Sequence, residues 1–203
     1  DLVSQVIPPD DFFTIFTDTQ MELPSTYETL KATEQYYKNK FPSFHISSAK
    51  QLNPILENWA DFGYPSRLQR WCCSVCKTSP YLSLIKKLST NSKPVAVYEG
   101  VRAEESNRRL AFERVAKGKK HQKITSARPI FYWNLSEVYL YLLYRNININ
   151  PAYRFGLTRV GCIVCPFSSE WSEYILNKLY PNKTKKFIES IEKTLPVIGI
   201  NDN

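Results

Sequence analysis

The chain has 203 residues, of which 43% are hydrophobic and 14% aromatic, enough for one substantial hydrophobic core. Its formal net charge is +8 and its pI is about 9.2, which favours anionic partners such as nucleotide phosphates, sulfate esters or nucleic acid. No apolar run approaches the roughly 20 residues of a membrane-spanning helix. The six glycines cannot form a glycine-rich phosphate loop. Composition therefore excludes helical membrane spans and a P-loop within these residues.

Taken in chain order, the hydrophobic pattern predicts short strands alternating with helices. Residues 12–17 form an apolar, β-prone run before the polar Asp18 and Thr19, which predicts a buried strand with polar groups at its carboxyl end. Helices are expected at 24–40, 50–59, 80–87 and 138–144, strands at 44–47, 94–99 and 130–133, and a helical tail at 169–194 interrupted at Pro181. This alternation indicates an α/β fold, a three-layer sandwich with a mainly parallel sheet.

The domain organisation follows from the same pattern. We expect one α/β domain over residues 1–168 and a C-terminal helical extension over 169–203 packed on that domain. In parallel sheets, ligands bind beyond the carboxyl ends of the strands. Three polar segments are expected there, namely the end of the first strand, the segment around Cys72, and Gly100 to Arg102. The unusual residues of the chain should therefore share one rim of the sheet.

All five cysteines lie in two clusters, formed by Cys72, Cys73 and Cys76 and by Cys162 and Cys165. Cys-x-x-Cys pairs that converge from distant segments usually hold a metal ion or an iron–sulfur cluster. Spacing leaves the ligand set open, because Cys73, Cys76, Cys162 and Cys165 form a regular pattern that would also suit zinc. The odd number of cysteines and the lack of a signal peptide argue against disulfides, so we expect a cytoplasmic, reducing location.

A basic stretch at residues 114–123 contributes part of the positive charge. Most such runs are solvated surface, and nucleic-acid contact is the alternative interpretation.

Five segments, in order, resemble motifs of the phosphoadenosine phosphosulfate (PAPS) reductase-like family. Residues 16–26 resemble its F-x-D-T-G-x-x-x-P-E-T segment, and residues 71–80 are similar to the C-C-x-x-R-K-x-x-P element of adenosine phosphosulfate-using relatives. Residues 100–109, 129–138 and 150–162 resemble G-x-R-x-x-[EQ]-S-x-x-R, P-I-x-x-W-x-x-x-[DE]-V and N-P-x-Y-x-x-G…G-C. The resemblance implies a Rossmann-like fold of the adenine nucleotide alpha-hydrolase-like type, with a nucleotide or nucleotidyl-sulfate pocket at the carboxyl edge of the sheet.

The resemblance also implies a ligand set for the metal centre. It selects Cys72, Cys73, Cys162 and Cys165 as ligands of a [4Fe–4S] cluster, with zinc as the alternative metal, and it leaves Cys76 as a spare thiol.

Seven further residues are expected to bind the nucleotide or tune the cluster. Arginine bridges phosphate or sulfate oxygens with a planar fork, so three arginines are assigned to the anion. The other four would line the nucleotide side or place a cation beside the thiolates. The set is Asp18, Thr19, Lys77, Gly100, Arg102, Arg109 and Arg159. The competing interpretations are ion pairs of the arginines with Glu104 or Glu105, turn capping by the aspartate, and an ordinary surface lysine.

The chain departs from the family pattern at three places. The S-G-G-x-D-S phosphate loop is missing, and we expect it upstream of Asp1 in a longer protein. Gln20 and Ser25 stand where the family has glycine and glutamate. The C-terminal E-C-G-x-H element is also missing, so a thiol-based sulfonucleotide reductase is not expected. The chain looks closer to uncharacterised members and to the iron–sulfur proteins of DNA phosphorothioation.

The main hypothesis is an enzyme of sulfur activation or transfer that binds ATP or adenylyl sulfate, carries a [4Fe–4S] cluster and works with a redox or sulfur-carrier protein. No catalytic residue is assigned. The isolated chain should be inactive, because chemistry at the α-phosphate needs the upstream loop. The alternative is a nucleic-acid-associated modification or defence module with a structural zinc or iron–sulfur site and no sulfonucleotide turnover. A regulatory homologue without turnover is a third interpretation.

Overall fold

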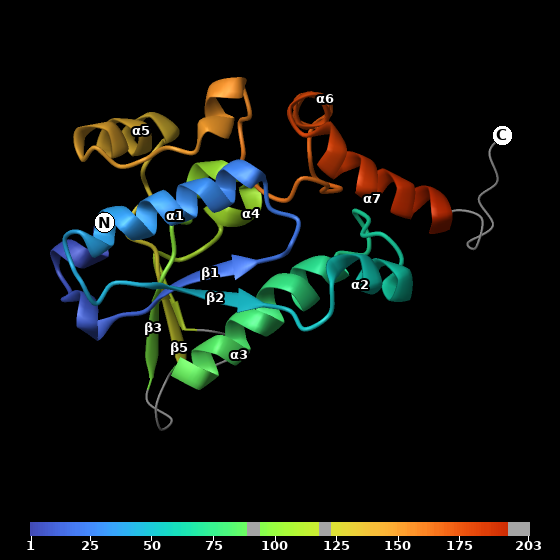
Figure 1. Cartoon of the computed structure of the whole chain (residues 1–203). Helices are drawn as coiled ribbons and strands as arrows, with labels where there is room; N and C mark the ends of the chain where they lie inside the picture. The colour runs from blue at the N-terminus through green and yellow to red at the C-terminus, as the bar shows by residue number, and fades with distance from the viewer. Residues whose placement is uncertain (89–93, 118–122, 195–203) are drawn as a thin grey trace.

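A computed structural model describes residues 1–88, 94–117 and 123–194 of the chain (Figure 1). Strand β1 (Thr14–Asp18) pairs in parallel with β2 (Ile46–Lys50), with Thr14 opposite Ile46. Strand β3 (Val95–Tyr98) pairs in parallel with β5 (Ile124–Ala127), and β4 (Val115–Lys117) is antiparallel to β5. The α/β architecture with parallel strands is confirmed. The described strands form two sheets, β1-β2 and β3-β5-β4.

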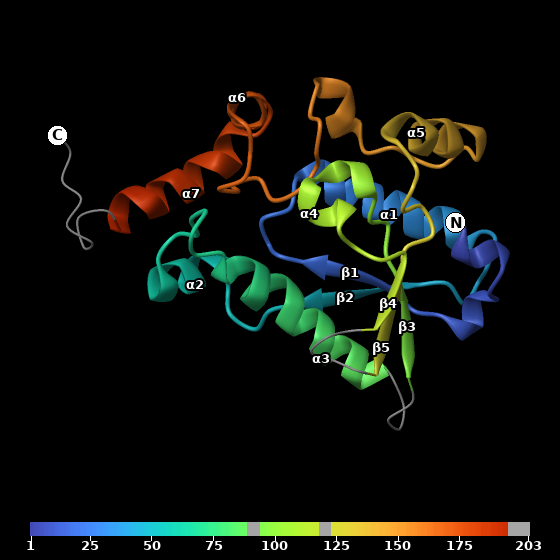
Figure 2. The ribbon, with the colours of Figure 1, turned by 180° about the vertical axis from the view of Figure 1, so that it is seen from behind.

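Helices cover both sides of the first sheet. Figure 1 shows α1 (Pro24–Lys38) on one side of β1 and β2, and α3 (Ser79–Leu88) on the other. Seen from behind in Figure 2, α4 (Asn107–Leu110) lies near α1, and α5 (Leu135–Tyr144) lies beyond it. The first sheet is therefore the middle layer of three, as predicted.

Several local signals set the helix boundaries. Pro24 at the first helical position opens α1, where its missing N–H has no cost. A capping box between Asn134 and Glu137 opens α5. The tail forms α6 (Glu170–Leu179) and α7 (Pro181–Thr194), so the predicted interruption at Pro181 is confirmed.

Short irregular helices connect these elements. They include four 3₁₀ segments and one π-helix that carries two of the cysteines: Val3–Gln5, Pro9–Asp11, Ala103–Glu105, Pro151–Phe155 and the π-helix Cys73–Thr78.

Two sequence predictions of secondary structure were wrong. The helix expected from residue 50 begins at Ile55 in α2 (Ile55–Phe62), because Lys50 is the last residue of β2 and Pro54 precedes the helix. The strand expected at 130–133 is a turn, in which the Trp133 N–H donates to the Ile130 carbonyl. Its apolar character arises because Phe131 is buried in that turn. Sequence reasoning missed the neighbouring β4 and β5, which are only three and four residues long and lack a continuous apolar run.

The main core cluster lies at the carboxyl end of β1 rather than between the two sheets. Its ten buried members are Met21, Leu23, Ile55, Trp59, Cys76, Ala152, Leu157, Ile163, Leu176 and Phe187. Phe187 of α7 packs on Trp59 of α2, with ring centroids 5.0 Å apart. Among the helices of the described ranges, none combines the length and hydrophobicity of a membrane span.

Candidate functional site

The carboxyl end of β1 is closed by a dense hydrogen-bond arrangement around Asp18. Its Oδ1 accepts hydrogen bonds from the Gln20 backbone N–H at 2.8 Å and from the Tyr27 hydroxyl at 2.7 Å. Its Oδ2 lies 3.4 Å from Lys50 Nζ. The predicted alternative role, capping the turn after the strand, is therefore what this carboxylate does in the structure.

Thr19 points toward the thiols. Its hydroxyl donates to Glu22 Oε1 at 3.0 Å and lies 3.6 Å from Cys162 Sγ. Both Thr19 and Glu22 are buried. Burial raises the pKa of Glu22, opposed by the Lys77 charge and by the hydrogen bond from Thr19. Thr19 therefore links the end of β1 to the second cysteine pair.

The residue after Thr19 explains one departure from the family pattern. Gln20 has φ = +62°, the left-handed conformation that favours glycine, which is the family residue at this position. Its side-chain Oε1 accepts the Ile55 N–H, the first helical donor of α2, at 2.9 Å. Gln20 therefore has a strained backbone conformation, and its side chain caps the amino end of α2, a helix distant in sequence.

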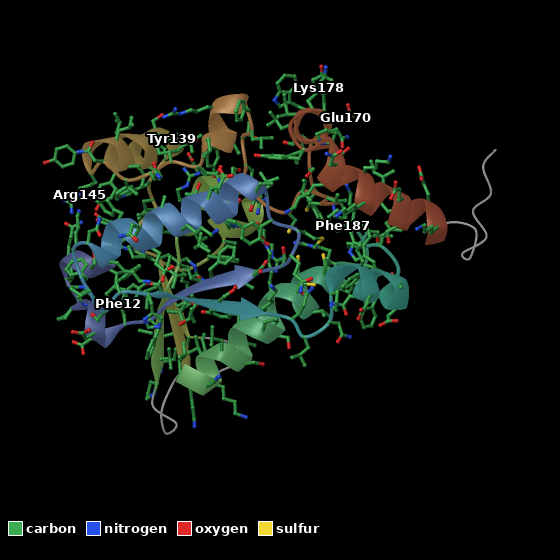
Figure 3. The ribbon with its side chains drawn as sticks, viewed as in Figure 1. Phe12, Tyr139, Arg145, Glu170, Lys178 and Phe187 are labelled. Carbon is green, nitrogen blue, oxygen red and sulfur yellow. The ribbon has the colours of Figure 1, made fainter. Side chains whose placement is uncertain are left out.

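Backbone pairing brings the two cysteine clusters to this edge. The Ile163 N–H donates to the Met21 carbonyl at 2.6 Å, and Glu22 forms an antiparallel bridge with Cys162. Cys73 opens the π-helix that precedes α3, and the end of β1 contacts that π-helix. In Figure 3 the sulfur atoms, drawn in yellow, gather where β1 ends and α3 begins. The prediction that the fold unites the clusters is confirmed.

The thiols interact electrostatically. The hydrogen bond from Cys72 lowers the pKa of the Cys73 thiol to about 5, with further lowering from Arg70, whose Nη2 lies 3.9 Å from Cys73 Sγ. The same bond to Cys73 raises the pKa of Cys72, as do burial and the charges of Cys73, Cys162 and Cys76. Burial raises the pKa of Cys162, and the charge of Cys165 raises it further. Each thiolate that forms therefore raises the pKa of its neighbouring thiols, so that deprotonating the next thiol requires more free energy.

Cys76 differs from the other four cysteines. It is fully buried in the core cluster, whereas Cys72, Cys73, Cys162 and Cys165 are partly accessible. Burial raises the pKa of Cys76 to about 11. Burial also raises the pKa values of Cys72 and Cys162, so Cys76 is distinguished by its full burial, which is typical of a structural thiol. The choice between the two predicted ligand sets stays a prediction.

Lys77 is exposed, and its charge reaches the thiols. It lowers the pKa values of Cys73, Cys76 and Cys162 as well as that of Glu22. The structure therefore places this lysine beside the thiols, as the sequence predicted.

The structure also brings together the three predicted arginines. Burial lowers the pKa of Arg109, and the charges of Arg159 and Arg102 lower it further, so each of these two guanidiniums repels that of Arg109. Ion pairs offset part of this repulsion: Arg102 contacts Glu104 and Glu105, and Arg109 contacts Glu105. The predicted alternative, helix-surface ion pairs, is thus realised. None of the ion pairs between described residues involves Arg159, which is exposed.

Gly100 follows β3 on the arginine side of the rim. A Cβ atom built there would meet Ile130 Cδ1 at 3.9 Å, an ordinary contact, so the protein itself does not require glycine at this position. Of the basic stretch 114–123, residues 118–122 lie outside the described ranges.

Three residues of the site escaped sequence reasoning. Glu22 stands at an unspecified position of the motif and Tyr27 directly follows the motif, and only the fold turns them toward the thiols and Asp18. Gln51, 8% exposed, lies beside Cys76, and its amide lowers the pKa of that thiol as a hydrogen-bonding neighbour would. The contact does not have the geometry of a full hydrogen bond, and neither amide atom has another hydrogen-bond partner among the described residues. No sequence signal announces this buried amide.

The donor set is compatible with an iron–sulfur cluster by its chemistry, because cysteine thiolates are the usual ligands of such clusters, and four thiolates also suit zinc. Within the described ranges, which include all five cysteines, no three Cys, His, Asp or Glu side chains are arranged around one metal-ion position.

Residues 1–168 match the phosphoadenosine phosphosulfate reductase domain family. An uncharacterized protein of Methanocaldococcus jannaschii is 30% identical over 156 residues, which are 77% of this chain and 31% of that protein. A second protein of that organism is 28% identical over 194 residues, or 95% and 44% of the two chains.

Two named enzymes are also similar. The adenosine 5'-phosphosulfate reductase of Anoxybacillus flavithermus is 30% identical over 171 residues, covering 81% of this chain and 66% of that enzyme. The crystal structure of phosphoadenylyl-sulfate (PAPS) reductase from Candida auris, a phosphate complex, aligns with a TM-score of 0.57 at 22% identity, covering 80% and 73% of the two chains. This chain thus spans from under a third to about two thirds of the length of these curated relatives.

Parallel strands, flanking helices and a polar rim at the strand ends define an α/β protein of the Rossmann-like class, and the Candida auris structure shares its fold. Within that class, the chain belongs to the phosphoadenosine phosphosulfate reductase domain family, so the resemblance seen in the sequence is confirmed.

Proposed function

We propose that the protein binds adenylyl sulfate or a related adenine nucleotide and holds a [4Fe–4S] cluster, as an enzyme of sulfur activation or transfer. The observation that carries the proposal is the short segment from Arg159 to Cys165. Its arginine belongs to the group formed with Arg102 and Arg109, while Cys162 contacts Thr19 at the end of β1. An anion site and a thiol site therefore share one rim.

The arginine group suits a sulfate or phosphate. Arg109 and the two guanidiniums that repel it gain stability when a dianion lies between them, and arginine can bind oxyanions through two parallel hydrogen bonds. The similarity to an adenosine 5'-phosphosulfate reductase supports a sulfonucleotide as that anion. In this proposal Gly100 leaves space for the ligand on the same side, and Asp18 shapes the turn beside it.

The thiol group suits the cluster. Cys72, Cys73, Cys162 and Cys165 would hold it, and Lys77 would offset its negative charge. When bound, the cluster would supply a redox-active centre. Thr19 and Glu22, which lie against Cys162, would orient that ligand.

The cluster is tested by anaerobic purification followed by a visible spectrum and metal analysis. We expect a brown protein with about four irons and labile sulfide per chain. Cys162→Ser should lose most of the iron, whereas Cys76→Ser, the matched control, should retain it. A colourless protein with one zinc would overturn the cluster. Loss of iron in Cys76→Ser with retention in Cys72→Ser would show the other ligand set.

The anion site is tested by titrating adenylyl sulfate into the chain and measuring heat. Arg109→Lys should weaken binding about tenfold, because lysine cannot form the bidentate contact. Arg108→Lys is the matched control, since Arg108 is the exposed neighbour, and its affinity should be unchanged. Equal affinity in both variants, or no binding by the original chain, would refute this part of the proposal.

A further inference from the structure

Four large aromatic side chains are exposed on either side of the second cysteine pair in the sequence. Phe155 is 50% exposed, Phe167 48%, Trp171 54% and Tyr174 53%. Single exposed aromatic residues are common in soluble proteins, whereas a group of them marks an interaction site. We call these four residues the aromatic surface.

Contacts fix two of these rings in a nearly parallel arrangement. The Trp171 indole N–H donates to the Gly156 carbonyl at 3.0 Å, which holds the ring against the turn that follows Phe155. The Tyr174 ring lies one helical turn further along α6 and stacks on the Trp171 ring, with centroids 5.9 Å apart and an interplanar angle of 29°. The two rings are therefore held at the surface in a defined orientation while about half of each side chain stays exposed.

Cations lie beside these rings. Lys178 Nζ is 5.4 Å from the centroid of the Tyr174 ring, and Figure 3 shows this lysine at the edge of the molecule. The Arg70 guanidinium lies over the Phe167 ring at 4.3 Å. The Arg67 Nε–H donates to the backbone carbonyl that precedes Phe167, at 2.9 Å. The loop before the π-helix thus brings two arginines to the segment that joins the second cysteine pair to α6.

A third arginine, Arg154, directly precedes Phe155. All four cations are exposed, and none of the ion pairs between described residues involves them. Exposed cations without acidic partners create a positive potential that attracts anions. The set is Arg67, Arg70, Arg154 and Lys178.

Two acidic residues limit the aromatic surface on one side. Glu170 and Glu173 lie in the first turn of α6 and are exposed. Because an α-helix turns by about 100° per residue, Trp171, Tyr174 and Lys178 fall on one face of α6 and the two glutamates on the next. An anionic partner should therefore cross the rings toward the arginines rather than follow the acidic face.

We propose that the aromatic surface and its four cations bind single-stranded nucleic acid. Unpaired bases would stack on the exposed rings, and the phosphates between them would contact the arginines and the lysine. A duplex hides the faces of its bases, and an acidic peptide lacks such faces, so both would leave the rings without stacked partners. Only a single strand matches the charge and the rings together.

The proposal goes beyond the nucleotide and cluster sites, because none of these eight residues is assigned to either. It also places the strand close to the thiols, since Arg70 Nη2 is 3.9 Å from Cys73 Sγ. A strand bound on the aromatic surface would therefore lie beside the candidate cysteine site.

The test titrates the chain into a fluorescein-labelled single strand of 20 thymidines and measures fluorescence anisotropy. We expect saturable binding at 50 mM salt. With four phosphates contacted, the logarithm of the affinity should fall with the logarithm of the salt concentration with a slope of about −3. A duplex of the same length should bind at least about fivefold more weakly, because its bases cannot stack on the rings.

Variants of one ring separate stacking from folding. Trp171→Ala should weaken binding of the single strand about tenfold. Trp171→Phe loses the hydrogen bond to Gly156 but keeps a flat ring, so it should retain most of the affinity. Tyr144→Ala is the matched control, because Tyr144 is 83% exposed on α5, away from the aromatic surface, and its affinity should be unchanged.

Variants of one cation test the electrostatic part. Lys178→Gln should reduce the magnitude of the salt slope by about 0.7. Lys31→Gln is the control, an exposed lysine of α1, and should leave the slope as it is. Affinity for adenylyl sulfate should be the same in Trp171→Ala as in the original chain, so this test and that of the proposed function can fail separately.

Four outcomes would overturn the proposal. The first is that the original chain does not bind the single strand at 50 mM salt, and the second is equal affinity in Trp171→Ala and Tyr144→Ala. The third is loss of binding in the double variant Lys117→Gln, Lys123→Gln with full binding in Trp171→Ala, which would place the strand on the basic stretch. The fourth is that polyglutamate competes as well as the unlabelled single strand, which would indicate an acidic protein as the partner.

Discussion

The two ends of β1 differ in how completely they are packed. At its carboxyl end, α2, α6, α7 and both cysteine clusters enclose a core of ten buried residues. Along its length toward the amino end, β1 faces an open groove. The segments that follow β1 therefore contribute most of the burial, while the middle of the expected sandwich contributes little. The chain is stabilised around its candidate metal site rather than within its sheets.

The largest loss of stability should come from truncating a large buried side chain in the packed region. Phe187→Ala, at the α7 residue labelled in Figure 3, removes a buried ring from its contact with Trp59 and should lower the free energy of unfolding by about 3–5 kcal/mol. Leu140→Ala on α5 is the control, because Leu140 is 67% exposed; we expect a change below about 0.5 kcal/mol. Urea unfolding measures both, and equal losses would contradict the contrast between the regions.

A smaller effect should follow from the polar part of the packed end. Tyr27→Phe removes the hydroxyl that donates to the nearly buried Asp18 carboxylate, a hydrogen bond to a charged group worth about 1.5–3 kcal/mol. Tyr144→Phe on the exposed surface should have no measurable effect. Thermal unfolding of the two variants provides the comparison. If they unfold at the same temperature, the Asp18 arrangement does not stabilise the packed end.

The smallest effect concerns Gln20, where two contributions oppose each other. Gln20→Gly relieves a left-handed conformation that costs a residue with a Cβ about 1–2 kcal/mol. It also removes the hydrogen bond to the Ile55 N–H, worth about 0.5–1.5 kcal/mol.

The net change in unfolding free energy for Gln20→Gly should therefore lie between about −0.5 and about +1.5 kcal/mol. Gln20→Ala keeps the strain and loses the bond, so it should be less stable than Gln20→Gly. Chemical denaturation of both variants measures the difference. An alanine variant as stable as the glycine variant would show that the φ angle carries no strain.

Sequence patterns predicted most elements because their signals are local. The boundaries of α1, α3 and the two tail helices depend on prolines and on apolar spacing within a few residues. β5 was missed because Ile124–Ala127 lacks a continuous apolar run, and 130–133 was taken for a strand because a buried turn can be equally apolar. Burial by distant segments decided both cases.

The candidate site divides in the same way. The residue types and spacing of the cysteines and of the arginine segment are visible in the sequence, and they sufficed to indicate the family and to predict that these residues share one rim of the sheet. Only the tertiary structure determines that the Asp18 carboxylate accepts a hydrogen bond from its own turn, that Cys76 is buried, and that Glu22 pairs with Cys162. It alone revealed which strands pair, because pairing between distant strands is a property of the folded chain and leaves no local pattern.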